Sequence, residues 1–197
     1  MICTTNLELA NRTAELTRQQ RRSQCQATDS MFGLLMLFQW VAAVWAACYV
    51  TPKAWVGEAV FLPHQHLWTA VIWGATISGI PLLLTIKYPG AATTRHVVAI
   101  SQMLFSGLLI YLTGGRPETH FHVFGSLAFL AFYRDWRVLV TASLVITADH
   151  FFSGIYSTQS ILESGGDGAF RCLEYSGWIV FENVFLVISC RREIRET

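Results

Sequence analysis

Six stretches of the chain are runs of apolar residues, and polar residues gather between them. The runs cover residues 31–50, 67–86, 97–113, 121–133, 138–156 and 175–190. A helix needs about 20 apolar residues to cross roughly 30 Å of hydrocarbon. The first two runs have that length, whereas the fourth and sixth are short and must borrow polar flanks or thin the bilayer. The pattern predicts a bundle of six transmembrane helices.

The composition favours the same fold class. Hydrophobic residues make up 53% of the 197 positions and charged residues only 14%, which is far fewer charges than soluble globular domains carry. Six crossings and their connections use most of the chain. We therefore expect an all-α, polytopic membrane protein with one bundle over residues 31–190. Residues 1–30, rich in Glu, Gln and Arg, predict a cytoplasmic amphipathic helix that tethers at the lipid surface.

Basic residues fall on one side of the membrane if the chain crosses it six times. They form four clusters: Arg12, Arg18, Arg21 and Arg22; Lys87 and Arg95; Arg134 and Arg137; and Arg191, Arg192 and Arg195. Cytoplasmic loops carry an excess of Lys and Arg. Both termini are therefore predicted to be cytoplasmic, in a multi-pass protein of the plasma membrane. Residues 134–137 predict a tight turn on that side, in which Asp135 offsets its two neighbouring arginines.

Five of the six histidines fall at the opposite, outer end of the predicted bundle, and carboxylates share their depth. Ionisable groups at membrane depth cost about 2.5 to 3.5 kcal/mol each, so they usually face the interior and have partners. Imidazole together with carboxylate suits zinc, copper or iron. The sequence therefore predicts a metal site at the outer end. The candidate ligands are His64, His66, His120, His122, His150, Glu118, Asp149 and Glu182.

Two alternatives stay open for these groups. The carboxylates can orient the histidines instead of binding the ion, and the whole set can be a hydrogen-bond network that ties short helices together. His96 lies at the other end and is not included. No catalytic residue and no site for an organic cofactor is assigned.

Residue spacing predicts which candidates share a helix face. If a helix begins at Pro117, then Glu118 and His122 lie on one face and His120 points elsewhere; an extended start would send both histidines to one side. Glu174, Trp178 and Glu182 follow one another at intervals of four, and we expect this stripe to face inward.

A long segment resembles a known family. The run from Gly114 to Arg137, GGRPETHFHVFGSLAFLAFYRDWR, resembles the membrane input module at the N-terminus of certain bacterial sensor histidine kinases and chemotaxis-type receptors. Looser matches are Pro63-His64-Gln65-His66, Thr94-Arg95-His96, Ala148-Asp149-His150 and Gly177-Trp178-Ile179-Val180-Phe181-Glu182. The resemblance extends from about Thr28 to Cys190.

The resemblance implies a sensory input domain of the bacterial inner membrane, a homodimer, and a ligand or metal site at the histidine and acidic positions. The family tends to carry a histidine at Tyr175, an arginine at Ser153 and an acidic residue at Asn183. The resembled proteins continue into a signalling helix and an output domain. Residues 191–197 are accordingly expected to begin that helix, and the chain contains no kinase or other catalytic output domain.

Two classes of function follow. In the first, the bundle binds a metal ion, or a small ligand held by a metal, from the outer side, and the last helix relays this to a cytoplasmic signalling domain or protein. The bilayer and a second copy of the chain are the other expected partners, and nucleic acid is not one. The alternative is a membrane-embedded metal-dependent hydrolase or oxidase with Glu182 or Asp149 as general base. The chain lacks an H-E-x-x-H motif, which disfavours this alternative.

Overall fold

The computed structural model describes residues 2–51, 63–161 and 167–196, and every regular element in these ranges is helical. The helices are α1 (Ile2–Tyr49), α3 (Pro63–Lys87), α4 (Ala92–Leu112), α5 (Pro117–Leu130), α6 (Trp136–Ile161) and α7 (Asp167–Glu196), and the 3-10 turn η1 (Ala131–Tyr133) joins α5 to α6. The all-α prediction is confirmed for these residues, and each of the six apolar runs lies on a helix.

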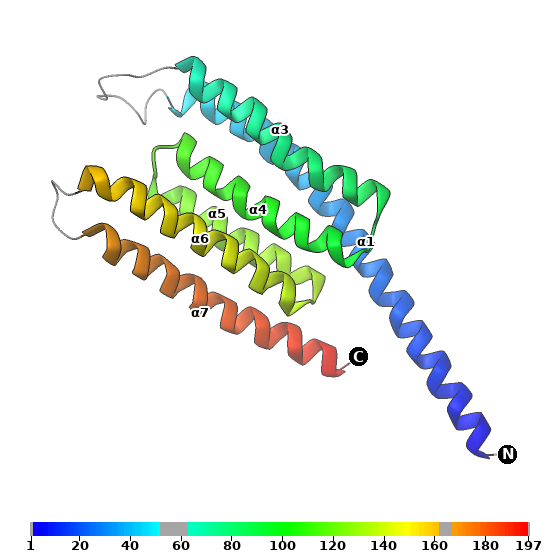
Figure 1. The fold of residues 1–197 in the computed structure, drawn as a ribbon. Coiled ribbons are helices and arrows are strands. Elements are labelled where there is room, and N and C mark those ends of the chain that lie inside the picture. Colours follow the sequence, from blue (N-terminus) through cyan, green and yellow to red (C-terminus); the bar gives the residue numbers. More distant parts are fainter. Residues whose placement is uncertain (1, 52–62, 162–166, 197) are drawn as a thin grey trace.

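Consecutive helices run in opposite directions, so the chain returns to each end of the bundle in alternation (Figure 1). At one end, which we call the histidine end, α1 and α4 finish, α3 and α5 begin, and α6 finishes beside the start of α7. At the other, the arginine end, α3 finishes at Lys87, α6 begins at Trp136 and α7 finishes. The predicted separation of the basic clusters from the five outer histidines therefore follows from this alternation.

Four helices contain a segment long and apolar enough to cross a membrane. The segments are Asn11–Tyr49, Gln65–Lys87, Ala92–Leu112 and Leu173–Arg192. They belong to α1, α3, α4 and α7, so the short run at 175–190 has the length of a crossing after all. Helix α5 has only 14 residues, and the run predicted at 138–156 extends beyond the side chains of α6 that the structure describes. By length and composition, four helices in the described part of the chain could each cross a membrane, which is consistent with a membrane protein.

Helix α1 is longer than any single crossing requires. Its 48 residues form one continuous helix of about 72 Å, where the sequence predicted a separate amphipathic helix over residues 1–30. The described side chains between Glu8 and Ser23 are exposed, and this half of α1 projects away from the bundle at the arginine end (Figure 1). The segment is therefore helical with exposed side chains, and the helix continues without interruption into the first apolar run.

Helix α4 lies at the centre of the bundle and takes part in both apolar cores. The larger core joins residues of α1, α4, α5, η1, α6 and α7, and the smaller one joins α1, α3 and α4. Half of the apolar window of α4 is buried, whereas only 11% of that of α7 is buried. Helix α7 therefore lies at the periphery, and most of its surface faces lipid or another chain.

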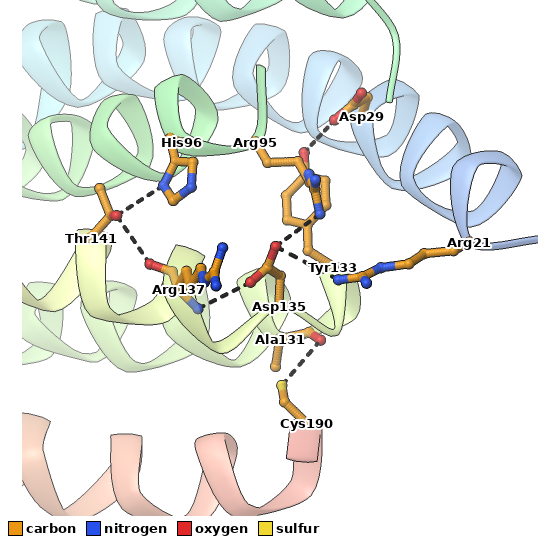
Figure 2. A network of polar contacts seen from close by, with 10 residues as sticks. All are labelled: Arg21, Asp29, Arg95, His96, Ala131, Tyr133, Asp135, Arg137, Thr141 and Cys190. Carbon is orange, nitrogen blue, oxygen red and sulfur yellow. Dashed lines mark hydrogen bonds and ion pairs between the residues drawn. The ribbon is translucent and has the colours of Figure 1, made fainter. Parts of the chain in front are cut away.

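Asp29 connects three segments at the arginine end (Figure 2). Its fully buried carboxylate accepts a hydrogen bond from the Tyr133 hydroxyl at 2.7 Å and another from the Gly90 N–H at 2.6 Å. Gly90 has a φ of +79°, a conformation that favours glycine, and so turns the chain between α3 and α4. Phe32 stacks on the Tyr133 ring with centroids 5.5 Å apart. The Asp29 carboxylate thus links α1 to the turn between α3 and α4 and to η1 between α5 and α6.

Asp135 pairs with arginines of other helices. Its carboxylate lies 3.0 Å from the Arg95 guanidinium of α4 and 3.9 Å from that of Arg21 in α1 (Figure 2). The sequence paired it with its neighbours Arg134 and Arg137; the structure adds the salt bridges to Arg95 and Arg21, and the Arg137 backbone N–H donates to the Asp135 carboxylate at 3.2 Å. Arg134 instead closes η1 in a left-handed conformation, with a φ of 51°.

The last turns of α7 contact this end of the bundle weakly. The Cys190 thiol lies 3.9 Å from the Ala131 carbonyl oxygen, and the Arg191 guanidinium lies 5.2 Å from the ring centre of Trp136. His96, which the sequence left out of the outer site, lies here with its Nδ1 2.9 Å from the Thr141 hydroxyl (Figure 2). The contacts of α7 add to the apolar packing of Leu186, Val187 and Cys190 on the larger core.

The contact between α1 and α3 yields a stability prediction. A Cβ atom at Gly74 would lie 2.6 Å from Cδ1 of Trp40, closer than side chains approach, whereas one at Gly79 on the same helix would meet nothing within 4 Å. We expect Gly74→Ala to lower the free energy of unfolding by about 1 to 3 kcal/mol, because Trp40 must move. Gly79→Ala, the matched control, should lower it by less than about 0.5 kcal/mol. Detergent-induced unfolding of both variants measures the difference.

Candidate functional site

His120 and His122 point in different directions because they lie on a regular helix. Two positions along an α-helix differ by about 200° around its axis, and α5 is helical from Pro117 onward. The helical alternative for this segment is therefore confirmed, and the extended start is wrong. One consequence is that the H-x-H pair cannot serve a single site from one side.

His122 faces the interior of the bundle, where both of its ring nitrogens have partners. Its Nε2 lies 3.0 Å from the amide nitrogen of Gln39 in α1, and its Nδ1 lies 2.8 Å from the Ser106 hydroxyl in α4 and 3.4 Å from that of Ser126. The Ser126 hydroxyl also accepts a hydrogen bond from the Gln102 amide at 2.9 Å. A single imidazole thus links α1, α4 and α5.

One consistent set of hydrogen-bond directions assigns the Nδ1–H tautomer to His122. The Ser106 hydroxyl donates its hydrogen to the main-chain carbonyl oxygen of Gln102 at 3.0 Å. The Ser106 oxygen therefore accepts a hydrogen bond from the Nδ1–H of His122. The Nε2 of a neutral imidazole is then an acceptor and receives the Gln39 amide hydrogen. Both nitrogens of His122 thus have hydrogen-bond partners, as expected for a hydrogen-bond network that ties helices together.

The His122 network does not continue across the bundle among the described residues. A layer of fully buried apolar side chains lies between it and the Asp29 carboxylate; its members are Phe32, Met36, Met103, Leu127 and Leu130. Along its own helix, each of these apolar residues lies nearer to the middle of the bundle than the polar residues of the two clusters do. The two polar clusters are therefore separate.

His120 and His150 meet at the histidine end, together with Tyr175. The ring centroids of the two histidines, from α5 and α6, are 5.7 Å apart and their planes are nearly perpendicular, at 87°. The Tyr175 ring of α7 stacks on His120 with centroids 4.5 Å apart and planes 11° apart, and lies 6.0 Å from His150. Three helices therefore contribute one ring each to this cluster, which we call the three-ring cluster.

Oxygen atoms hold the Nδ1 side of both histidines. The Nδ1 of His120 donates to the Arg116 carbonyl oxygen at 3.2 Å, and the Nδ1 of His150 lies 3.7 Å from a carboxylate oxygen of Asp149. Asp149 packs closely on Gly107 of α4, where a Cβ atom would come within 3.2 Å of both of its carboxylate oxygens. Histidines that bind metals usually direct their second N–H to a carbonyl or carboxylate in this way. Each Nε2 is left without a hydrogen-bond partner among the described residues.

The other predicted ligands lie apart from this pair. Glu118 is exposed in the first turn of α5. His66 is buried and packs against the Tyr111 ring, with centroids 5.4 Å apart. Glu182 lies two turns along α7 from Tyr175, with a buried carboxylate oxygen that has no hydrogen bond among the described residues. His64 is in the first turn of α3, and its side chain lies outside the described residues.

The stripe of α7 that the sequence predicted to face inward only partly does so. Glu174 is exposed and Trp178 is 55% exposed, so the expectation is wrong for these two residues. The reason is that α7 turns a different face to the larger core, the one that carries Ile179, Leu186 and Val187. Only Glu182 of the stripe turns toward neighbouring helices.

No three His, Cys, Asp or Glu side chains gather closely enough to hold one metal ion within residues 2–51, 63–161 and 167–196. What the structure brings together from the predicted set is the pair His120 and His150, with Asp149 behind it. The sequence pattern did not indicate Tyr175 as a member, although the resembled family carries a histidine at that position. It also overlooked Gln39, an amide isolated in an apolar run, which is the usual sign of an interior partner.

No protein-family model, no curated protein and no solved structure matches the chain.

Proposed function

We propose that this chain is a membrane signal-input domain that binds a transition metal ion through His120 and His150 and relays its binding through α7. The observation that carries the proposal is the meeting of one imidazole from α5 and one from α6 beside the first turns of α7. The resemblance to bacterial receptor input modules gives the same class of function.

The spacing of the two imidazoles suits a shared ion. Nitrogens about 2.1 Å from one zinc ion in tetrahedral geometry place two imidazole centroids roughly 5 to 6 Å apart, and the observed separation is 5.7 Å. The Nδ1–H of His120 is donated to a carbonyl oxygen, so its Nε2 lone pair is free to bind a cation. The Nδ1 of His150 lies 3.7 Å from the Asp149 carboxylate, which favours the same tautomer there. Zinc, copper and iron all accept imidazole ligands. Two protein ligands leave open positions for water or a small ligand, as reversible sensing requires.

In this proposal, the positions of the basic residues assign the two ends of the bundle to the two sides of the membrane. Basic residues of α1, α4 and α7 and of the turn before α6 lie at the arginine end, and an excess of Lys and Arg marks the cytoplasmic side. The three-ring cluster then faces the outside of the cell or the periplasm. In this arrangement all six helices cross the membrane, and α5 does so together with η1.

Helix α7 is suited to the relay because it contacts both ends and is little buried between them. It contributes Tyr175 to the three-ring cluster, and its last turns contact Ala131 and Trp136 at the arginine end. Only 11% of its apolar window is buried, and it packs on the larger core through Ile179, Leu186 and Val187, so a shift of α7 also moves these side chains. A ligand that binds two positions of α7 with unequal affinity would change their populations.

Metal analysis of the purified protein tests the site. We expect about one zinc or copper ion per chain after loading and desalting, and less than a tenth of that in the His120→Ala plus His150→Ala variant. His96→Ala is the matched control, because it removes an imidazole at the arginine end that bonds Thr141. A tag without histidine avoids a false signal. Equal metal content in the double variant and the control would refute the site.

A further inference from the structure

Beside the three-ring cluster, α5 and α7 enclose a groove of about 410 Å³. Its lining consists of Pro117, His120, Phe121 and Phe124 from α5 and Tyr175 and Trp178 from α7. None of these residues is Asp, Glu, Lys or Arg, and four of them are Phe, Tyr or Trp. The volume is within the range that small-molecule sites have.

The groove opens toward the surroundings of the bundle. Phe121 is 72% exposed and Trp178 is 55% exposed, and both helices are membrane-spanning in the proposed function. Large aromatic side chains exposed on such a surface face the bilayer, so a molecule reaches the groove from the lipid phase. This favours a lipid-soluble ligand with a flat ring, since the walls are themselves flat rings that stack.

The polar groups of the groove specify what the ligand carries. The Nδ1–H of His120 is donated to the Arg116 carbonyl, so the Nε2 of the neutral ring accepts a hydrogen bond and cannot donate one. The Tyr175 hydroxyl can donate or accept. A hydrocarbon chain of a lipid would leave both groups without partners. A ring that bears a hydroxyl satisfies His120, and a ring that bears a carbonyl satisfies only Tyr175.

We propose that this groove binds a lipid-soluble quinol, with one hydroxyl donating to Nε2 of His120 and the ring between Phe121 and Trp178. The oxidised quinone binds less tightly, because its oxygens are acceptors and one of them would face the lone pair of Nε2. The ligand bridges α5 and α7, so its binding changes the position of the helix that relays the signal. The domain then responds to the reduced fraction of the quinone pool.

This inference rests on the proposed function for the relay. Because the single Nε2 lone pair of His120 cannot bind a metal ion and accept a hydroxyl hydrogen at the same time, the quinol and the metal ion compete for this histidine. The test therefore uses protein treated with a chelator. The full chain is placed in phosphatidylcholine nanodiscs, and binding of a radiolabelled short-chain benzoquinol, kept anaerobic, is measured above its partition into nanodiscs without protein. The corresponding benzoquinone is measured in the same way.

We expect saturable binding of the quinol, at least fivefold tighter than that of the quinone. His120→Ala should weaken quinol binding about tenfold and bring the two affinities together, since one hydrogen bond is lost. Tyr175→Phe, which keeps the stacked ring, should weaken quinone binding more than quinol binding. Trp178→Ala should weaken both, whereas Trp73→Ala on α3, which is 59% exposed, is the matched control and should change neither.

Two results would overturn the inference: uptake no greater than that of empty nanodiscs, which means that lipid chains fill the groove, or equal affinities for quinol and quinone. Metal content is measured on the same preparations before chelation. Quinol binding without stoichiometric metal refutes the metal site alone, and metal binding without saturable quinol uptake refutes the groove alone.

Discussion

Asp29→Ala is expected to lower the free energy of unfolding by about 2 to 5 kcal/mol, the largest effect of any single substitution in this bundle. The carboxylate is fully buried and accepts hydrogen bonds from the Tyr133 hydroxyl and the Gly90 N–H. Each donor that loses a buried acceptor costs about 1 to 3 kcal/mol. The loss also frees α1 from η1 and from the turn before α4.

A variant that removes only one of the two hydrogen bonds to Asp29 separates their contributions to the free energy of unfolding. Tyr133→Phe removes one donor and keeps the ring that stacks on Phe32, so it should cost about 1 to 2 kcal/mol. Glu15→Ala, on the exposed half of α1, is the control and should cost less than about 0.5 kcal/mol. Unfolding of each variant in mixed detergent measures these values. An Asp29→Ala protein as stable as the Glu15→Ala protein would show that the carboxylate does not hold this end together.

His122→Ala and His120→Ala are expected to have opposite effects, although the residues are two positions apart. His122→Ala should lower the free energy of unfolding by about 2 to 4 kcal/mol, because it leaves a cavity and removes the partners of Gln39 and Ser106. It should leave metal binding in place. His120→Ala should lose most of the bound metal and change stability by less than about 1 kcal/mol, because its ring is only partly buried.

For each variant, the free energy of unfolding in detergent and the metal content are measured on the same preparation. His122→Gln is a useful companion, because an amide can replace part of the hydrogen bonding and should recover some of the stability. If His122→Ala removes the metal and His120→Ala does not, the two roles assigned to α5 are reversed and the site lies inside the bundle.

Much of the fold follows from the apolar pattern. Residues 67–86 and 97–113 of the sequence nearly coincide with the apolar parts of α3 and α4, because a run of that length has few alternatives to a helix in a membrane. The continuity of α1 through residue 30 was not predicted, since a change from polar to apolar composition does not by itself interrupt a helix. The crossing at 175–190 is longer than its apolar core because α7 continues through polar residues at both ends.

The sequence predicted at which end of the bundle the candidate site lies, but not which of its side chains face one another. Counting crossings placed His120, His122 and His150 at one end, and the alternation of the helices gives that result. Which of them meet depends on the rotation of each helix against its neighbours, which periodicity does not supply. The partner of His122 is Gln39, 83 positions away, and the partner of Asp29 is Tyr133, 104 positions away. Neither pair has a local sequence signal.

The arrangement separates two tasks along one bundle. Buried hydrogen bonds of His122 and Asp29 fix α1, α4 and α5 to one another, whereas α7 packs on the larger core through apolar side chains and is mostly exposed. In the proposed function, a ligand at His120 and His150 therefore moves the helix that is easiest to move. This is why a site at the edge of the bundle suits a signal-input domain better than one at its centre.

The most direct test of the account is a count of the imidazoles around a bound ion. Pulsed electron paramagnetic resonance of the Cu²⁺-loaded protein detects each coordinated imidazole through its remote nitrogen. The account predicts two imidazoles in the wild-type protein, one in His120→Ala and one in His150→Ala, with His122→Ala unchanged at two. A signal from the wild-type protein that persists unaltered in both single variants would contradict it.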